Sequence, residues 1–280
     1  MDYKTILVHL DQGARAAARL EVAFNVAAEF NAHLVGLFAV SATRIPAYVF
    51  AEADAPLIEA IRRNRAEGAK RAKSAFDAAA AKSDGIKTEW RSSDHDALEA
   101  MRISARYADL AIVGQRERGA ERDDGLAPEF VSEFVLSAGR PVLLVPYAGR
   151  FPQIGRRVLV AWNAGQEAAR AVADALPLLS RAETVKVMAF DPDKGGADHG
   201  DIPGADIALY LARHGVEVTV AQQRCGSEVV GEQILSRAAD MDADLIVMGA
   251  YGHSRVRELV LGGATRTLLE SMTVPVLMSR

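Results

Sequence analysis

Short apolar runs alternate along the chain with longer stretches of helical, amphipathic periodicity. Near-continuous apolar strands separated by helices indicate a parallel sheet covered by helices on both faces. The predicted strands are 4–10, 33–40, 86–91, 109–114, 141–146, 157–162, 184–190, 216–221, 244–249 and 274–279. The predicted helices are 15–30, 53–82, 96–106, 128–138, 165–180, 203–214, 227–241 and 263–272. The pattern therefore predicts an α/β fold.

The same blocks recur in the same order in the two halves of the chain. Ala108-Asp109-Leu110 with Gly114 returns as Ala243-Asp244-Leu245 with Gly249, and Arg140–Leu144 is echoed by Val274–Met278. Ordered repeats of this kind indicate duplication of one structural unit. We expect a first domain at 1–147, a linker at 148–155 and a second domain at 156–280.

Composition narrows the function classes. The 280 residues hold 33 Lys+Arg and 37 Asp+Glu, a formal net charge of −4. An acidic balance gives no electrostatic support for nucleic-acid or membrane-surface binding. The one cysteine, Cys225, excludes an internal disulfide framework. With no signal-peptide pattern and no transmembrane run, we expect a cytoplasmic protein.

A glycine-rich loop follows the fourth strand of the second half. Gly249 and Gly252 are followed, after nine residues, by Gly262-Gly263 and a predicted helix. Glycine backbone N–H groups and a helix N-terminus suit a phosphate, and His253, Arg255 and Arg257 add positive charge. The alternative is that these glycines only form tight strand-to-helix turns.

The stretches 243–252, 261–263 and 274–277 together resemble the C-terminal signature of universal stress proteins. The whole chain is similar to the tandem form of that family. The resemblance implies two five-stranded parallel sheets of order 3-2-1-4-5, a Rossmann-like, adenine nucleotide alpha hydrolase-like fold. It also implies an adenine nucleotide, such as ATP, as ligand, with Mg²⁺ only if a nucleotide is bound.

The resemblance further implies where the nucleotide would lie in the second domain. Asn163 stands where the family has a ribose-binding Asp, and Gly263 stands where it has Ser or Thr. The missing hydroxyl removes one phosphate hydrogen bond and weakens binding. Thr265 is near but out of register. The expected nucleotide-binding residues are Ala161, Asn163, Ala189, Phe190, Gly249, Gly252, His253, Gly262, Gly263 and Ala264.

The first half departs further from the family motif. The Gly-x-x-Gly spacing is absent after Gly114, although Asp11 remains after the first strand. Acidic residues in the following loop would repel a triphosphate. These residues are Glu117, Glu121, Asp123 and Asp124. We expect this half to have lost its nucleotide site.

Other candidate sites carry less specific signals. His199 and His214, with Asp198, Asp201 and Asp206, suggest a metal site, although a solvated acidic loop explains them as well. Cys225 follows Arg224 and precedes a predicted helix, which favours a reactive thiol, against the alternative of a small residue at a strand end. Ser93 and His95 show no oxyanion arrangement, and Asp94 is expected to cap the next helix.

The predicted function is an adenine-nucleotide-responsive stress or regulatory protein. The alternatives are a nucleotide-independent interaction or scaffold protein of the same fold, and a weak ATPase. The ATPase is disfavoured because no general base or metal carboxylate is evident beside the proposed phosphates. We expect the fifth strands, near 141–145 and 275–279, to pair within the chain, and a homodimer or an unidentified protein partner remains open.

Overall fold

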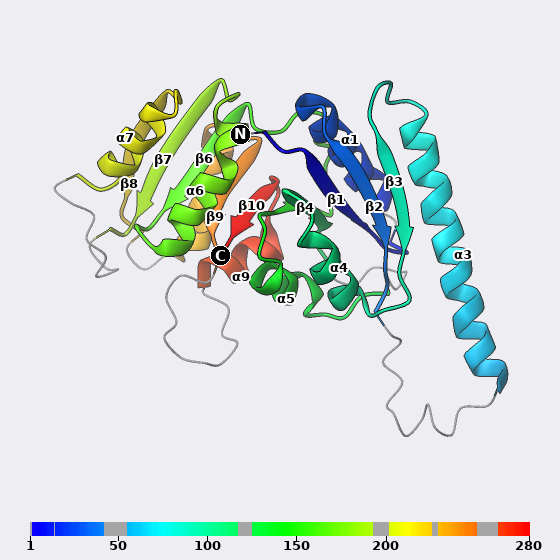
Figure 1. The fold of residues 1–280 in the computed structure, drawn as a ribbon. Helices are drawn as coiled ribbons and strands as arrows, with labels where there is room; N and C mark the ends of the chain where they lie inside the picture. Colours follow the sequence, from blue (N-terminus) through cyan, green and yellow to red (C-terminus); the bar gives the residue numbers. More distant parts are fainter. Residues whose placement is uncertain are drawn as a thin grey trace.

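A computed structural model of the chain describes residues 2–13, 15–41, 55–116, 125–192, 202–225, 229–250 and 263–280. Strands and helices alternate in it (Figure 1). The strands are β1 (Thr5–Leu10), β2 (His33–Phe38), β3 (Thr88–Ser92), β4 (Leu110–Gly114), β5 (Val142–Val145), β6 (Arg157–Trp162), β7 (Thr184–Phe190), β8 (Val218–Gln223), β9 (Leu245–Gly249) and β10 (Val276–Ser279). The helices are α1 (Ala16–Phe30), α3 (Ala55–Ala80), α4 (Ala97–Ala105), α5 (Phe130–Ser137), α6 (Gln166–Leu179), α7 (Ala205–Arg213), α8 (Val230–Asp240) and α9 (Gly263–Ser271).

All ten strands belong to one sheet, of order β3-β2-β1-β4-β5-β10-β9-β6-β7-β8. The α/β fold with a mostly parallel sheet is confirmed. Each half keeps the expected strand order 3-2-1-4-5, but the two halves form one continuous ten-stranded sheet and not two sheets. The fifth strands, β5 and β10, run antiparallel, with Leu143 opposite Leu277. Without this pairing, β5 and β10 would each be an edge strand with unpaired backbone N–H and C=O groups. Their pairing provides hydrogen-bond partners for these groups on both strands.

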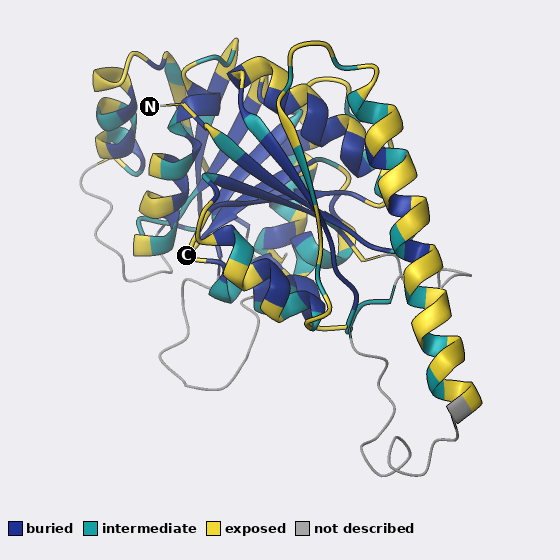
Figure 2. Cartoon of the chain, turned by 45° about the vertical axis from the view of Figure 1, so that its right-hand side comes forward, coloured by how far each residue is buried: buried dark blue, intermediate teal, exposed yellow. Residues whose placement is uncertain are grey.

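Helices cover both faces of this sheet. Helices α1, α3, α6 and α7 bury residues in one apolar cluster, and α4, α5, α8 and α9 bury residues in the other. Successive strand residues point to opposite faces, so Ile6 and Val8 join the first cluster while Leu7 joins the second. Figure 2 shows the buried strands between helices whose outer faces are exposed.

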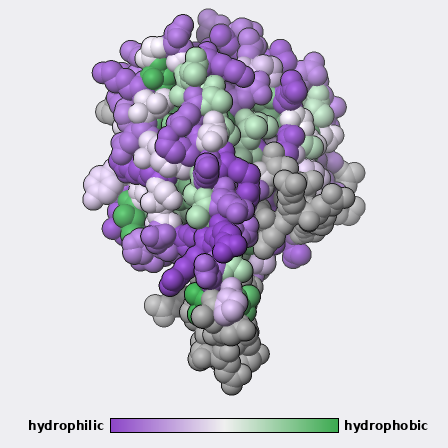
Figure 3. Space-filling model, turned by 90° about the vertical axis from the view of Figure 1, so that its right-hand side faces the viewer, coloured by the Kyte–Doolittle hydropathy of each residue, from purple (hydrophilic) through white to green (hydrophobic). Residues whose placement is uncertain are grey.

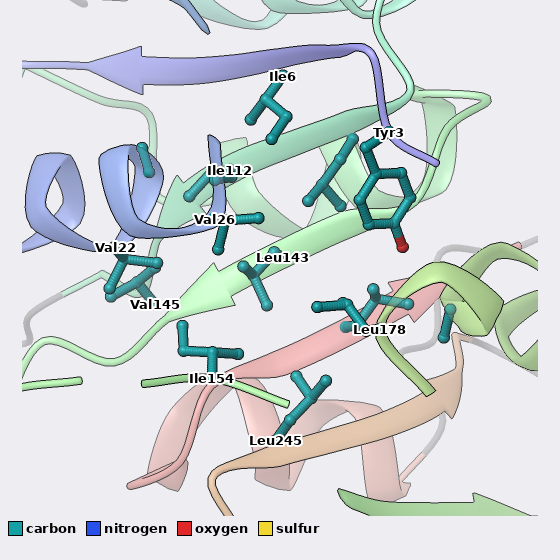
Figure 4. Packing of buried hydrophobic residues seen from close by; sticks show 14 of the residues in the cluster. Tyr3, Ile6, Val22, Val26, Ile112, Leu143, Val145, Ile154, Leu178 and Leu245 are labelled. Carbon is teal, nitrogen blue, oxygen red and sulfur yellow. The ribbon is translucent and has the colours of Figure 1, made fainter. Parts of the chain in front are cut away.

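The first apolar cluster is continuous across the two halves of the chain. Figure 4 shows Leu143 and Val145 of β5 in the same cluster as Leu178 of α6 and Leu245 of β9. The Tyr3 hydroxyl donates to the Asp174 carbonyl oxygen at 2.7 Å, and this buried position raises the pKa of Tyr3. The two halves therefore share a core as well as a sheet.

The long helix α3 lies at the β3 end of the sheet. Its exposed face carries ion pairs one turn apart, Arg63–Glu59 at 3.4 Å and Lys73–Asp77 at 2.6 Å. Figure 3 shows this side of the molecule, where most of the described surface is hydrophilic. None of the described helices is both long and apolar enough to cross a membrane.

The predicted boundaries differ from the observed ones at several elements, among them the two edge strands. The strands β3 and β8 begin two residues later than predicted, because Ile86 and Val216 are anchored in the core before strand pairing begins. The prediction that Asp94 caps α4 is wrong. The cap is Asp96, whose Oδ1 accepts the Leu98 N–H at 3.0 Å.

Candidate functional site

The predicted nucleotide-binding residues of the second half gather at the carboxyl edge of the sheet. Strand β6 lies between β7 and β9, so strand order reverses beside it, as at ligand sites of open parallel sheets. The predicted residues that the structure describes are Ala161, Asn163, Ala189, Phe190, Gly249, Gly263 and Ala264. Those that lie outside the described residues are Gly252, His253 and Gly262, and Arg255 and Arg257 lie there too.

Asn163 closes a tight turn immediately after β6. Its Oδ1 accepts the Gly165 N–H at 3.0 Å, and Ala164 between them has φ +56°. Such a left-handed conformation is costly for a residue with a Cβ and occurs often at functional sites. A matching hydrogen bond follows β1, where Asp11 Oδ1 accepts the Gly13 N–H at 2.8 Å, although Gln12 between them is not left-handed. The duplication thus extends to the hydrogen bond of this turn.

The two residues predicted to lie along the adenine, Ala189 and Phe190, are at the end of β7. Ala189 is fully buried within the sheet and pairs with Trp162 on one side and Gln222 on the other. Phe190 is the last residue of β7, and Asp191 follows it with φ +44°. The Asp191 carboxylate accepts the Cys225 N–H at 2.7 Å. Sequence reasoning missed Asp191, because its left-handed backbone has no sequence signal.

Gly249 has a packing role of its own. A Cβ on this last residue of β9 would collide with the backbone of α6, at Ala168 N and, at 2.5 Å, at Glu167 C. Glycine is therefore required for the close approach of α6 to β9. This observation favours the tight-turn alternative at Gly249.

Gly263 is different, because a Cβ there would meet no atom of the described residues within 4 Å. It is the first residue of α9, and Ala264 follows it, half-buried. The first N–H groups of a helix have no intrahelical acceptors, so this end suits an anion. Thr265 points into the core and is buried, in agreement with its being out of register.

Glu167, in the first turn of α6, was missed from the sequence. A Cβ on Gly165 would lie 3.0 Å from Asn163 Oδ1 and 3.4 Å from Glu167 Oε2. The Cβ of Glu167 lies 2.8 Å from the position a Cβ would take on Gly249. A carboxylate therefore does lie at the proposed site. The available sequence signal was an acidic residue in the first turn of the helix predicted after strand 157–162.

The corresponding edge of the first half is occupied by a buried ion pair. Arg19 Nη2 donates to Asp11 Oδ2 at 2.6 Å, and both side chains are 5% exposed. Burial would raise the pKa of Asp11, but the charges of Arg19 and His9 and the Gly13 N–H hold it below the ordinary value. The same guanidinium fills the space next to Gly114.

Aromatic packing fills the same edge further. The rings of His9 and Phe130 lie 4.8 Å apart between centroids, and both are buried. Burial lowers the pKa of His9 to about 4, so the ring is neutral near pH 7. Counting along the matching first strands, the second half has Ala161 at the place of His9. Counting back from the matching fifth strands, it has Ala264 at the place of Phe130. Two small side chains thus replace a buried ring pair.

The other candidate sites receive little support. In the described part of the chain, no group of three or more His, Cys, Asp or Glu residues could hold a metal ion. His199, Asp198 and Asp201 lie outside that part, and the His214 ring packs at a tilt of 55° against the Tyr210 ring, with 4.6 Å between their centroids. Cys225 is buried at the end of β8, which fits a small residue at a strand end. Asp94 pairs with Arg65 at 3.8 Å.

Comparison with known proteins identifies the second half. The model of the Universal stress protein family matches residues 155–280. A curated universal stress protein from Synechocystis is 45% identical over 49 residues. That match covers 18% of this chain and 17% of the relative, so it extends over less than a fifth of either protein.

Solved structures match over the whole chain. A universal stress protein from Archaeoglobus fulgidus superposes with a TM-score of 0.72 at 18% identity, covering 99% of this chain and 98% of its own. A functionally unknown protein from Pseudomonas aeruginosa superposes with a TM-score of 0.60 at 15% identity, covering 99% and 92%. At these identities the likeness shows the fold, and it includes both halves.

Proposed function

Residues 155–280 belong to the universal stress protein family, and from this premise we propose that the chain is a regulatory protein that binds an adenine nucleotide. The binding site lies at the carboxyl edge of the second half. There Asn163 contacts the ribose, the backbone at Phe190 faces the adenine, and the N–H groups of Gly263 and Ala264 meet a phosphate. Gly252, His253 and Gly262 complete the phosphate loop.

The observation that carries this proposal is the difference between the halves at one pair of positions. His9 is fully buried and Phe130 is 1% exposed, whereas Ala161 is 9% exposed and Ala264 is half-buried. In the first half, the His9 and Phe130 rings occupy the space between the sheet and α5. In the second half, the corresponding space beneath α9 is lined by the small side chains of Ala161 and Ala264. The ligand site therefore belongs to the second half alone.

The test is titration of the full chain with ATP, ADP and AMP by isothermal calorimetry. We expect one saturable site per chain. Ala264→Phe places a ring where the first half has Phe130, and we expect it to abolish binding. Ser271→Phe, an exposed position at the far end of α9, is the matched control and should bind normally.

Circular dichroism and the thermal midpoint of each variant show whether the fold is kept. Two results contradict the proposal: no saturable binding of any of the three nucleotides at millimolar concentration, or full binding by a folded Ala264→Phe variant. A stoichiometry of two would contradict the assignment of the site to the second half.

The second candidate is a nucleotide-independent interaction protein of the same fold. One observation favours it, because Gly249 is explained by its contact with the backbone of Ala168 and Glu167 without any ligand. The two functions differ at Gly263, where the described residues give no packing reason for glycine. A substitution of Gly263 should therefore change nucleotide affinity if the first function is right, and it should have no measurable effect on nucleotide binding if the second is right.

A further inference from the structure

The carboxylate of Glu167 lies beside the turn that would hold the ribose. One point, the position of a Cβ on Gly165, lies within 3.5 Å of the Asn163 amide and of Glu167 Oε2. Asn163 and Glu167 are both half-buried, so water screens them only in part. On the other side, the Cβ of Glu167 adjoins Gly249. Any phosphate chain that runs from Asn163 towards Gly249 passes this carboxylate.

Nothing positive among the described residues compensates for this charge. No ion pair of Glu167 is formed within the part of the chain that the structure describes. Counting from the shared turn, the first half has Arg15 at the matching position, and its guanidinium donates to the Gly149 carbonyl oxygen at 2.7 Å. The two halves thus carry opposite charges at one place in the repeat.

We propose that Glu167 makes the second-half site selective for an adenine nucleotide with a single phosphate over the diphosphate and triphosphate. This inference rests on the proposed function and names the ligand class of that site. Each added phosphate brings further negative charge close to a partly desolvated carboxylate, and like charges repel most strongly there.

Glu167 has a simpler structural role that the test must separate from selectivity. An acidic residue in the first turn of α6 interacts favourably with the N-terminus of that helix. Loss of this interaction would lower the thermal midpoint of the protein without changing the ratio of its affinities for two ligands. The AMP-to-ATP affinity ratio is therefore the decisive readout.

The experiment measures AMP and ATP binding to the full chain by calorimetry, in EDTA and again with Mg²⁺. We expect the wild type to bind AMP at least about tenfold more tightly than ATP in EDTA. Glu167→Gln should bring the two affinities within about threefold, mainly by tightening ATP. Glu217→Gln, an equal charge change just before β8 at the opposite edge of the sheet, should leave the ratio unchanged.

Three outcomes would overturn the inference. The first is equal or tighter ATP binding by the wild type in EDTA, and the second is an unchanged ratio in Glu167→Gln. The third is tight Mg²⁺-ATP binding that Glu167→Gln abolishes, which would make the carboxylate a cation ligand. In all three the nucleotide site itself still stands. If neither nucleotide binds the wild type, the proposed function fails and this inference fails with it.

Discussion

Arg19 Nη2 lies 2.6 Å from Asp11 Oδ2, and this buried ion pair distinguishes the two halves of the chain. The matching residues of the second half are Asn163 and Ala171, neither of them charged. With the small Ala171 in place of arginine, the backbone of α6 lies directly against Gly249. In the first half, the Arg19 guanidinium therefore packs against Gly114 at the end of β4. In the second half, the backbone of α6 packs against Gly249 at the end of β9.

The ion pair predicts a large asymmetry between single and double substitutions. Arg19→Met leaves the Asp11 carboxylate buried and uncompensated, so it should lower the free energy of unfolding by roughly 3–5 kcal/mol at pH 7. Asp11→Asn combined with Arg19→Met reproduces the uncharged chemistry of the second half and should recover most of that loss. Urea denaturation of the three variants checks this. Additive losses in the double variant would show that the pair is not coupled.

His9 predicts a pH dependence of stability. Its folded-state pKa of about 4 lies below the ordinary value of 6.5, so between these values the unfolded state binds more protons. The free energy of unfolding should therefore fall as the pH drops from 6.5 to 4, by about 3 kcal/mol for this group. His9→Gln cannot titrate and should show a shallower slope in this window. Equal slopes in denaturation series of both proteins would contradict the buried, neutral histidine.

Gly249 predicts a stability effect that is independent of ligand. Gly249→Ala forces a Cβ against the backbone of Glu167 and Ala168, which cannot move aside as a side-chain end can. We expect a loss of about 1–3 kcal/mol, as for other overpacked sites. The thermal midpoint should fall equally with and without nucleotide. Gly263→Ala, where a Cβ meets nothing, is the matched control and should keep its midpoint.

Gly263 predicts a gain of function. Gly263→Ser adds a hydroxyl at the first residue of α9 without steric conflict, and that hydroxyl can donate to a bound phosphate. We expect about tenfold tighter AMP binding, the value of one hydrogen bond to a charged acceptor. Gly263→Ala controls for the added Cβ and should bind as the wild type does. Equal calorimetric affinities for the serine and alanine variants would refute a phosphate at this helix end.

The elements of the fold were predictable because their signals are local. Apolar runs and helical periodicity are read over a few residues, and the repeated blocks around Gly114 and Gly249 indicate the duplication directly. The glycine loop and Asn163 were found from spacing and resemblance. Sequence alone therefore determined the α/β class and indicated the duplication, and it named the region of the second half in which we propose a ligand site.

The tertiary structure decided the features that depend on residues far apart in the chain. The pairing of β5 with β10 was expected from their two edges, but its antiparallel register and the single ten-stranded sheet that it forms appear only in three dimensions. The reach of Arg19 to Asp11 and the position of Glu167 beside Gly249 likewise depend on how closely each helix approaches its strand. That distance is set by packing of the whole core, because burial and charge compensation at the strand ends are properties of the assembled sheet and not of any segment.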